Sequence, residues 1–248
     1  MPLSPLGIEV DGVTKRLRTT QALRGVTARF EPGRLHGLIG PDGAGKTTLL
    51  RLLVGLLRPD AGTIRFHAGM DTVPFDTVRP AMAYMPQQQS LYPDLSVAEH
   101  LEFFQELYQI PAEVYAERSA RLLALTRLEA FRDRAARQLS GGMYKKLGLM
   151  CALLQSPRVV LLDEPTNGVD PISRREFWAL LYDLVGQGIL VVVSTAYMDE
   201  AERCGTVHML DDGRLLAAGE PRALLASEKA ASFEEIFLRS AGATAGTP

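Results

Sequence analysis

The sequence predicts an α/β protein whose core is a parallel β-sheet with crossover helices. Residues 158–165, RVVLLDEP, contain a run of apolar residues that is typical of a strand buried on both faces of such a sheet. A helical stretch follows at 171–185, and a second apolar run, ILVVV, comes after it at 189–193. Strand, helix and strand in this order indicate a parallel sheet, because parallel neighbours need a crossover connection.

The N-terminal region predicts an antiparallel layer that leads into the parallel sheet. Residues 7–35 alternate apolar and polar side chains between turn signals, which favours antiparallel strands. The apolar segment LHGLI at 35–39 then runs into a glycine-rich turn, and the leucines of 47–57 predict a buried helix after that turn. A further hairpin is expected from GTIRF, residues 62–66, onward.

A helical insertion is expected between residues 91 and 155. Ser96 and Glu99 fit a capping box, in which each side chain accepts the other residue's backbone N–H. Pro111 is expected to start a second helix. The apolar residues that follow the capping box at helical spacing are Leu101, Phe104, Leu107 and Tyr108.

The chain is therefore expected to divide into two parts. Residues 1–90 and 156–248 form the core with its antiparallel layer, and this part includes a last hairpin that turns at Asp212-Gly213. Residues 91–155 form a helical subdomain.

The composition argues against nucleic acid as a partner and against a membrane span. Basic residues number 27 and acidic residues 29, so the net charge of −2 provides no basic field to recruit nucleic acid. The N-terminus MPLSPLGIEV lacks the charged start and apolar core of a signal peptide. The longest fully apolar run, LGLMCALL at 147–154, is far shorter than a membrane-spanning helix. Any role at a membrane is expected to depend on a partner protein.

The segment GPDGAGKT at 40–47 matches the phosphate-binding pattern G-x-x-x-x-G-K-[ST]. Its glycines let backbone N–H groups turn inward around a polyphosphate, beside the positive N-terminal end of the next helix. Lys46 is expected to reach the β- and γ-phosphates, and the Thr47 hydroxyl to bind Mg²⁺. The alternative, a glycine-rich turn with a solvated lysine, is disfavoured by the position between strand and helix. The expected nucleotide contacts are Gly40, Pro41, Asp42, Gly43, Ala44, Gly45, Lys46, Thr47 and Thr48.

Two acidic residues end the predicted strand VVLLDE at 159–164. Asp163 is the candidate Mg²⁺ ligand, and Glu164 is the candidate catalytic residue that polarises an attacking water. An acidic strand end that merely meets solvent would be an equal alternative if it stood alone. The phosphate-binding loop in the same chain disfavours that alternative.

A second glycine-rich helix start, LSGGM, occupies residues 139–143. Ser140 is a good N-cap, and Gly141 and Gly142 leave the first amides of the next helix open to an anion. An ordinary capped helix would be favoured if this were the only such motif. Two phosphate-binding helix starts in one chain suggest instead that each copy completes the nucleotide site of a partner.

Five motifs together resemble the ATP-binding subunits of ABC transporters. They are GPDGAGKTT, MPQ at 85–87, LSGGM, VVLLDEP and NGVD at 167–170, in the order and approximate spacing of that family. The resemblance covers nearly the whole chain and implies a P-loop NTPase (RecA-like) core, ATP and Mg²⁺ as cofactors, and ATPase activity. It also implies dimerisation and a transmembrane permease as partner, which would place the chain at the cytoplasmic face of the membrane.

The same resemblance assigns roles to residues outside the phosphate-binding loop. Gln87 would contact Mg²⁺, take part in catalysis and couple the site to the permease. Ser140, Gly141 and Gly142 would hold the γ-phosphate bound by the opposite subunit. Asp170 would lie at the dimer contact. Taken alone, Gln87 is a polar loop residue and Asp170 is a helix cap.

Three positions depart from the family pattern. Leu17 stands near the position of an aromatic residue that stacks on adenine, which leaves a weaker and less directional apolar contact. Met143 replaces the usual last glutamine of the signature motif. Ala196, in STAYMDEAE, replaces a histidine that would donate a hydrogen bond to the γ-phosphate and orient the attacking water. His36 and His208 lie on predicted strands and are expected to be structural, not substitutes for it.

Short runs such as LSGGM and GVDPISRREFW are most similar to the first ATP-binding half of tandem ABC-2 type exporters, in which a second half carries the histidine. The leading hypothesis is an ATPase subunit whose ATP-driven dimerisation moves a separate permease. The alternative is a degenerate nucleotide-binding module whose partner subunit does most of the hydrolysis. The sequence is compatible with a homodimer and with a heterodimer. Soluble ABC ATPases of DNA repair and of translation are disfavoured, since this sequence shows neither a long coiled-coil insertion nor two joined ATPase units.

Overall fold

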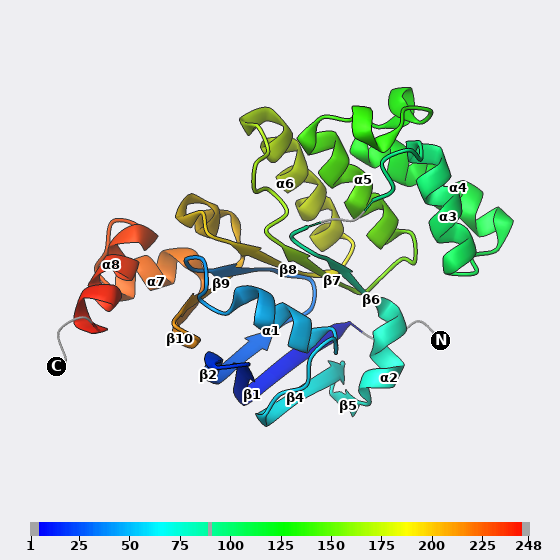
Figure 1. Ribbon diagram of the computed structural model, residues 1–248. Helices are drawn as coiled ribbons and strands as arrows, with labels where there is room; N and C mark the ends of the chain where they lie inside the picture. Colours follow the sequence, from blue (N-terminus) through cyan, green and yellow to red (C-terminus); the bar gives the residue numbers. More distant parts are fainter. Residues whose placement is uncertain (1–4, 89–90, 245–248) are drawn as a thin grey trace.

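The computed structural model describes residues 5–88 and 91–244, which fold into two β-sheets with helices between and beside them (Figure 1). The smaller sheet is antiparallel, with the strand order β2-β1-β4-β5. Its strands are β1 (Leu6–Leu17), β2 (Thr20–Phe30), β4 (Ala61–Ala68) and β5 (Asp71–Val73). The predicted antiparallel layer is confirmed.

The larger sheet has the strand order β10-β9-β3-β8-β7-β6 and is parallel except for the terminal hairpin of β9 and β10. Its strands are β3 (Leu35–Ile39), β6 (Met82–Met85), β7 (Val159–Asp163), β8 (Leu190–Thr195), β9 (Thr206–Asp211) and β10 (Arg214–Gly219). Asp212 and Gly213 form the turn of that hairpin. The parallel sheet and the last hairpin are therefore as predicted.

Both faces of the larger sheet are buried, which explains its uninterrupted apolar runs. In β7, Val159 and Leu161 belong to the core shared with the smaller sheet, whereas Val160 and Leu162 belong to the core on the other side. Helix α1 (Lys46–Leu53) lies between the two sheets in Figure 1, and its leucines pack in their shared core. Because successive side chains of a strand point to opposite faces, every position of such a strand favours an apolar residue.

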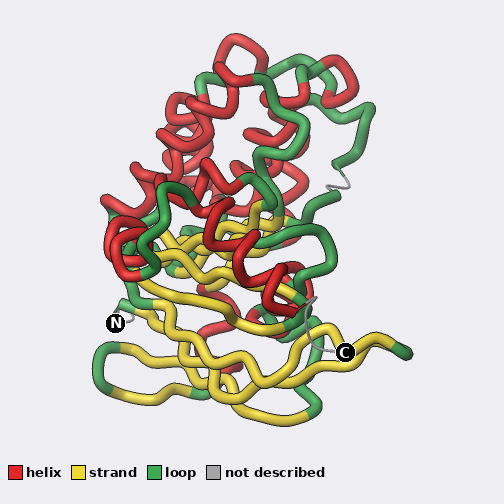
Figure 2. The backbone as a smooth tube through the Cα atoms, turned by 90° about the vertical axis from the view of Figure 1, so that its left-hand side faces the viewer, coloured by secondary structure: helices red, strands yellow, loops and turns green. Residues whose placement is uncertain are grey.

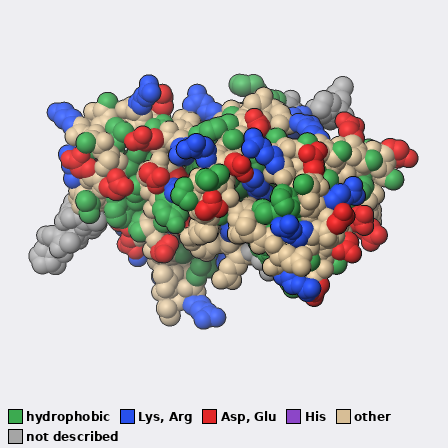
Figure 3. All heavy atoms as spheres, turned by 90° about the horizontal axis from the view of Figure 1, so that it is seen from above, with side chains coloured by type: hydrophobic (Ala, Val, Ile, Leu, Met, Phe, Trp, Pro, Cys, Tyr) green, Lys and Arg blue, Asp and Glu red, His purple; other side chains and the backbone are tan. Residues whose placement is uncertain are grey.

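Most of the remaining helices lie on the opposite face of the larger sheet, and Figure 2 shows them gathered above the strands. The α-helices after α1 are α2 (Phe75–Val78), α3 (Val97–Leu107), α4 (Ala112–Thr126), α5 (Gly141–Leu153), α6 (Pro171–Gly186), α7 (Pro221–Ser227) and α8 (Phe233–Thr244). Short 3-10 helices occupy Arg79–Ala81, Glu129–Phe131, Ala136–Gln138 and Met198–Arg203. None of the helices in the described part of the chain is both long enough and apolar enough to span a bilayer. The helical side carries basic and acidic side chains interspersed (Figure 3).

The helix starts predicted from the sequence are confirmed in their hydrogen bonds. Ser96 Oγ accepts the N–H of Glu99 at 3.2 Å, and the Glu99 carboxylate accepts the N–H of Ser96 at 2.7 Å. Ser140 Oγ accepts the N–H of Met143 at 3.3 Å at the start of α5. Pro111 immediately precedes α4. The serine caps satisfy backbone donors that have no partner inside the helix.

The apolar stripe predicted on α3 is wrong at one position. Leu101 is buried, and Phe104 and Tyr108 pack against the same core, but Leu107 is 59% exposed. At about 100° per residue, Leu107 lies about 120° around the helix axis from Leu101. It therefore points away from the core that the other three residues contact.

Two histidines form a buried pair in the larger sheet. Nδ1 of His36 on β3 and Nε2 of His208 on β9 are 3.2 Å apart, and the ring of Phe30 packs against both. Burial lowers the pKa of His36 to about 4. Burial, and next to it the neighbouring His36, lowers the pKa of His208 to about 3. Both histidines are structural, as their strand positions predicted.

The free energy of unfolding is expected to fall as the pH drops from about 7.5 to about 5.5. Unfolded histidines titrate near pH 6.5 (an approximate reference value), whereas His36 and His208 have folded pKa values of about 4 and about 3. The unfolded state therefore binds more protons below about pH 6.5, and stability that is present above that pH is lost as the pH falls. The slope approaches about 1.4 kcal/mol per pH unit for each histidine.

Denaturant unfolding at several pH values measures this slope. The variant His208→Leu places an apolar side chain beside Phe30. Its free energy of unfolding should change with pH at about half of the wild-type slope, because one titrating group is removed. An identical slope in the variant and the wild type would contradict this origin of the pH dependence.

Candidate functional site

The candidate site lies at the carboxyl ends of three neighbouring strands of the larger sheet, where ligands of open α/β sheets bind. The glycine-rich loop, Gly40–Gly45, follows β3, the acidic pair ends β7, and Ala196 follows β8. A cleft of about 370 Å³ opens here. It is lined by Leu17, Thr20, Ala22, Asp42, Gly43, Ala44, Gly45, Lys46, Thr47, Thr48, Gln87 and Glu164. Leu17 and Gln87, far apart in sequence from the loop, are thus brought to it.

At Gly40 and Gly45 the glycine-rich loop lies so close to neighbouring backbone that only glycine fits. Gly45 has a φ of 106°, in the left-handed region that other residues avoid. A Cβ atom on Gly45 would lie 2.6 Å from the carbonyl oxygen of Ala22, and one on Gly40 would lie 2.1 Å from that of Leu210. The glycines therefore hold the loop in a narrow turn of the kind whose backbone N–H groups bind phosphates.

Lys46 begins α1, and its side chain reaches back across the loop. The residue is 4% exposed, and Nζ donates to the carbonyl oxygens of Gly40 at 2.8 Å and Pro41 at 3.0 Å. Nζ also lies 3.3 Å from Oε1 of Glu164. Gly40 and Pro41 therefore form the base of the loop and hold Lys46, whereas the residues from Asp42 onward line the cleft. A phosphate in this loop would meet a positive charge that is already in position.

Asp163 is fully buried and is bonded by hydroxyl groups from three elements. Thr47 Oγ1 of α1 and Ser194 Oγ of β8 donate to Oδ1 at 3.0 and 2.6 Å, and Tyr84 of β6 donates to Oδ2 at 3.3 Å. Burial, and next the negative charge of Asp163, raises the pKa of Tyr84. These hydrogen bonds connect the start of α1 to β6, β7 and β8.

The pair of Thr47 and Asp163 fits a magnesium ion. A hydroxyl and a carboxylate oxygen 3.0 Å apart are donors of the kind that Mg²⁺ prefers. No group of three or more His, Cys, Asp and Glu side chains suited to a metal occurs among residues 5–88 and 91–244. A cation bound by Thr47 and Asp163 would therefore take its other ligands from phosphate, water and the Gln87 side chain, which lines the same cleft.

Glu164 lines the cleft, and its side chain and backbone are hydrogen-bonded to several residues. Its Oε2 accepts hydrogen bonds from Gln87 Nε2 at 2.8 Å and from Asn167 Nδ2 at 3.3 Å, while Oε1 faces Lys46. Its backbone N–H donates to Ser194 Oγ at 2.9 Å. The φ of Glu164 is 46°, an uncommon conformation for a residue other than glycine that often occurs at functional sites. This turn in the backbone directs the side chain of Glu164 away from that of Asp163.

Four further residues support the acidic pair and Gln87, and none of them is among the candidate site residues predicted from the sequence. Ser194, Tyr84 and Asn167 contact the acidic pair, and Lys145 of α5 donates from Nζ to the carbonyl oxygen of Gln87 at 3.0 Å. Burial lowers the pKa of Lys145. Ser194 had one available signal, a polar residue directly after the apolar run of β8, at the edge where the acidic pair lies. Asn167 lies in the NGVD segment, to which the sequence gave no role for this side chain, whereas Tyr84 and Lys145 are brought in by the tertiary fold alone.

The signature residues lie apart from the cleft of their own chain. Ser140 and Gly141 are exposed at the N-terminus of α5 and do not line the cleft of the glycine-rich loop. Gly142 is buried against α6, where an added Cβ would lie 2.4 Å from Cβ of Ser173. Asp170 caps α6, and its Oδ1 accepts the N–H groups of Ile172 and Ser173 at 3.1 and 3.0 Å. The structure thus brings Lys46, Thr47, Asp163, Glu164 and Gln87 together, but not the signature.

Ala196 is exposed directly after β8, and the residues after it are firmly held. Tyr197 donates from its hydroxyl to Asn167 Oδ1 at 3.4 Å. Glu200 is fully buried, and a single oxygen, Oε1, accepts from Arg174 at 2.6 Å, Thr166 at 2.9 Å and Trp178 at 3.0 Å. The segment that carries Ala196 is therefore tied to α6 and to the loop that holds Glu164.

Comparisons with known proteins agree with these features. The chain is 44% identical over 229 residues to the probable multidrug ABC transporter ATP-binding protein YbhF of Escherichia coli K12. The aligned region covers 91% of this chain but only 39% of that protein. It is 36% identical over 233 residues to the Nod factor export ATP-binding protein I of Ralstonia nicotianae, and this aligned region covers 93% of the chain and 72% of that protein. A solved ATP-binding subunit of an ABC transporter has a TM-score of 0.80 at 28% identity and covers 94% of this chain and 98% of its own.

A family model described as ABC transporter matches residues 23–167. The matched range contains the glycine-rich loop, Gln87, the signature and the acidic pair. It spans more than half of the chain, and the relative from Ralstonia nicotianae is similar over most of both sequences. The chain therefore belongs to the ABC transporter family, as an ATP-binding domain.

Proposed function

We propose that the chain binds ATP with Mg²⁺ and hydrolyses it to ADP and phosphate to drive a membrane exporter of the ABC-2 type. The observation that carries this proposal is the convergence of Lys46, Asp163 and Glu164 at one glycine-lined cleft, with Lys46 3.3 Å from Glu164 and Thr47 3.0 Å from Asp163. A lysine, a metal-ligating pair and a second carboxylate are the groups that transfer of a phosphoryl group to water requires.

Each group has a distinct task in this proposal. Lys46 exchanges its contact with Glu164 for the β- and γ-phosphates, while the loop amides hold the remaining oxygens. Thr47, Asp163 and Gln87 are the proposed ligands of Mg²⁺, which when bound neutralises charge on the phosphate oxygens. Glu164, released from Lys46, orients and polarises the attacking water, with Gln87 beside it at 2.8 Å. The proposed nucleotide contacts within the chain are Gly40, Pro41, Asp42, Gly43, Ala44, Gly45, Lys46, Thr47 and Thr48.

A second subunit completes the site in this proposal. Ser140, Gly141 and Gly142 begin a helix but lie outside the cleft of their own chain. We infer that they close over the γ-phosphate in the cleft of a partner, as a homodimer or as a heterodimer with a second ATP-binding subunit. Asp170, exposed at the start of α6, would lie at that contact.

ATP-binding subunits of ABC transporters work with transmembrane permease subunits, and the family of this chain supports the same arrangement here. We infer that the chain works at the cytoplasmic face of the membrane against transmembrane permease subunits. Residues 91–155, which contain α3, α4 and α5, would form the helical subdomain that carries the signature, on a core of 1–90 and 156–248. The names of the two relatives, a probable multidrug transporter protein and a Nod factor export protein, support export as the direction.

A degenerate nucleotide-binding module is the alternative. Ala196 has no hydrogen-bond donor in its side chain, and Leu17 cannot stack on adenine. The Escherichia coli relative leaves about three fifths of its length unmatched, which is enough for a second unit of this size. In such an arrangement the partner would hydrolyse most of the ATP. Glu164, which is present and held in place, favours hydrolysis by this chain.

The variants Lys46→Ala and Glu164→Gln should separate binding from hydrolysis. Removing the ammonium of Lys46 is expected to weaken ATP binding by about tenfold or more, because a charge-assisted contact to phosphate is lost. Glu164→Gln should keep ATP affinity within about twofold and lower the steady-state hydrolysis rate by at least about a hundredfold. Nucleotide titration and phosphate release measure the two quantities. Unchanged phosphate release in Glu164→Gln would exclude Glu164 as the catalytic residue.

The variant Ala196→His should raise ATP hydrolysis if the missing donor limits the rate. A single preorganised donor to developing charge is worth about 10²–10³ in rate in other enzymes, so an increase of at least about tenfold is expected here. ATP affinity should change little. The matched control is Ala116→His on the exposed side of α4. Robust wild-type hydrolysis that Ala196→His leaves unchanged would contradict the degenerate-site alternative.

The variant Leu17→Tyr should tighten nucleotide binding. Leu17 is 37% exposed and lines the cleft beside the glycine-rich loop. Ring stacking is worth about 0.5–1.5 kcal/mol beyond apolar burial, which corresponds to about two- to tenfold in Kd. Titration with ATP and with inorganic triphosphate distinguishes the base contact from phosphate binding. Tighter binding of both ligands would place the effect elsewhere than at the adenine.

A further inference from the structure

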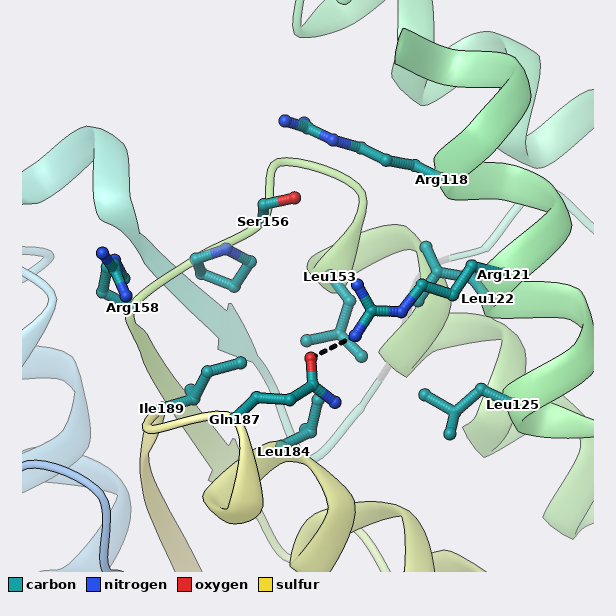
Figure 4. A pocket seen from close by; sticks show the side chains of 11 residues that line it. Arg118, Arg121, Leu122, Leu125, Leu153, Ser156, Arg158, Leu184, Gln187 and Ile189 are labelled. Carbon is teal, nitrogen blue, oxygen red and sulfur yellow. Dashed lines mark hydrogen bonds between the residues drawn. The ribbon is translucent and has the colours of Figure 1, made fainter. Parts of the chain in front are cut away.

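A second cavity, of about 260 Å³, lies at the opposite end of the larger sheet from the glycine-rich loop. It is bounded by α4, by the loop that leads into β7 and by the loop that leads into β8 (Figure 4). Nothing in the ATP-binding proposal uses this cavity, and the inference drawn from it does not depend on that proposal.

The floor of the cavity is apolar. Leu122 of α4, Leu153 of α5, Leu184 of α6 and Ile189 before β8 are all buried and line it. Figure 4 shows these side chains together in the middle of the view, below Arg118 and Ser156. Apolar ligand atoms placed on this floor would be removed from water, which favours binding.

The rim of the cavity is basic. Arg118, Arg121 and Arg158 line it, and the lining includes neither aspartate nor glutamate. In Figure 4, Arg118 and Arg158 border the opening on either side of Ser156. Three guanidinium groups around one small space repel one another, so the space has a preference for a negative charge.

Two of these arginines donate to neutral partners. Arg118 donates to the carbonyl oxygen of Leu154 at 3.0 Å, and Arg121 donates to Oε1 of Gln187. Neither forms a salt bridge with a carboxylate of the described residues, whereas nine other arginines there do. Guanidinium groups bind carboxylates through two parallel hydrogen bonds, and donors remain available on both side chains.

We propose that this cavity binds a small amphiphilic carboxylate, with its apolar part on the leucine floor and its carboxylate among Arg118, Arg121 and Arg158. The volume lies just below the range of about 300–1,000 Å³ that is usual for drug-sized ligands, so a medium-chain carboxylate suits it better than a larger molecule. A bound carboxylate contacts α4 together with the loops before β7 and β8. Its binding therefore stabilises the packing of the helical segment on the sheet.

Octanoate is the probe for this proposal, measured with the purified full chain by calorimetry and by thermal unfolding. Saturable binding in the millimolar range or tighter and a raised Tm are expected. Octylamine and octanol, which have the same tail and a positive or neutral head, should bind at least about tenfold more weakly. Equal binding of octylamine, or no saturable binding of octanoate, would overturn the proposal.

Two kinds of variant locate the bound octanoate. The double variant Arg118→Gln/Arg121→Gln should weaken binding at least about tenfold. Gln187→Glu keeps every arginine but places a carboxylate beside Arg121, and it should weaken octanoate binding to a similar extent without loss of folding. The matched control Arg214→Gln, on exposed β10, should bind like the wild type. Wild-type binding in both Arg118→Gln/Arg121→Gln and Gln187→Glu would refute this location.

Discussion

The buried carboxylate of Asp163 is the constraint on which the rest of the site depends. A carboxylate removed from water is costly unless its oxygens are hydrogen-bonded. In this chain the bonds come from Thr47, Ser194 and Tyr84, on α1, β8 and β6. Displacing any of these elements leaves the charge under-bonded. The position of the glycine-rich loop relative to the strands is therefore set by a polar network, whereas the apolar cores on both faces set only the stacking of the layers.

Adjacent acids acquire different environments because the backbone turns between them. Asp163 ends β7 with hydroxyl partners on rigid elements, whereas Glu164, at a φ of 46°, faces the cleft with Lys46 and Gln87 as partners. Lysine and glutamine side chains are long and can exchange partners at low cost. Gln87 is also linked through its carbonyl oxygen to Lys145 of α5. A change at Glu164 therefore has a direct route to the helix that begins with the signature.

The sequence predicted the parts of this molecule that depend on local pattern and missed those that depend on packing. The loop of Gly40–Gly45 can be predicted because its steric requirements fall on residues close together in the sequence. The strands of the larger sheet can be predicted because both of their faces are buried. The prediction for Leu107 was wrong because an apolar stripe does not reveal which of its residues a helix turns away from the core. Tyr84 reaches Asp163, and Lys145 reaches the carbonyl oxygen of Gln87, only through the fold, and their types and spacing gave no signal. The contacts of the proposed nucleotide and metal ligands with ATP and Mg²⁺ stay predictions.

Ala196 offers no side-chain donor, yet the segment that carries it is firmly held. Glu200, four residues later, is fully buried and bonded to Thr166, Arg174 and Trp178 through one oxygen, while its other oxygen has no partner among the described residues. Such a carboxylate is expensive to bury, and its three donors come from the loop after the acidic pair and from α6. These bonds offset the cost of burial and anchor the segment from Ala196 to Glu200, although Ala196 offers no donor. The hold on this segment depends on the bonds of Glu200, and it is therefore independent of which side chain stands at position 196.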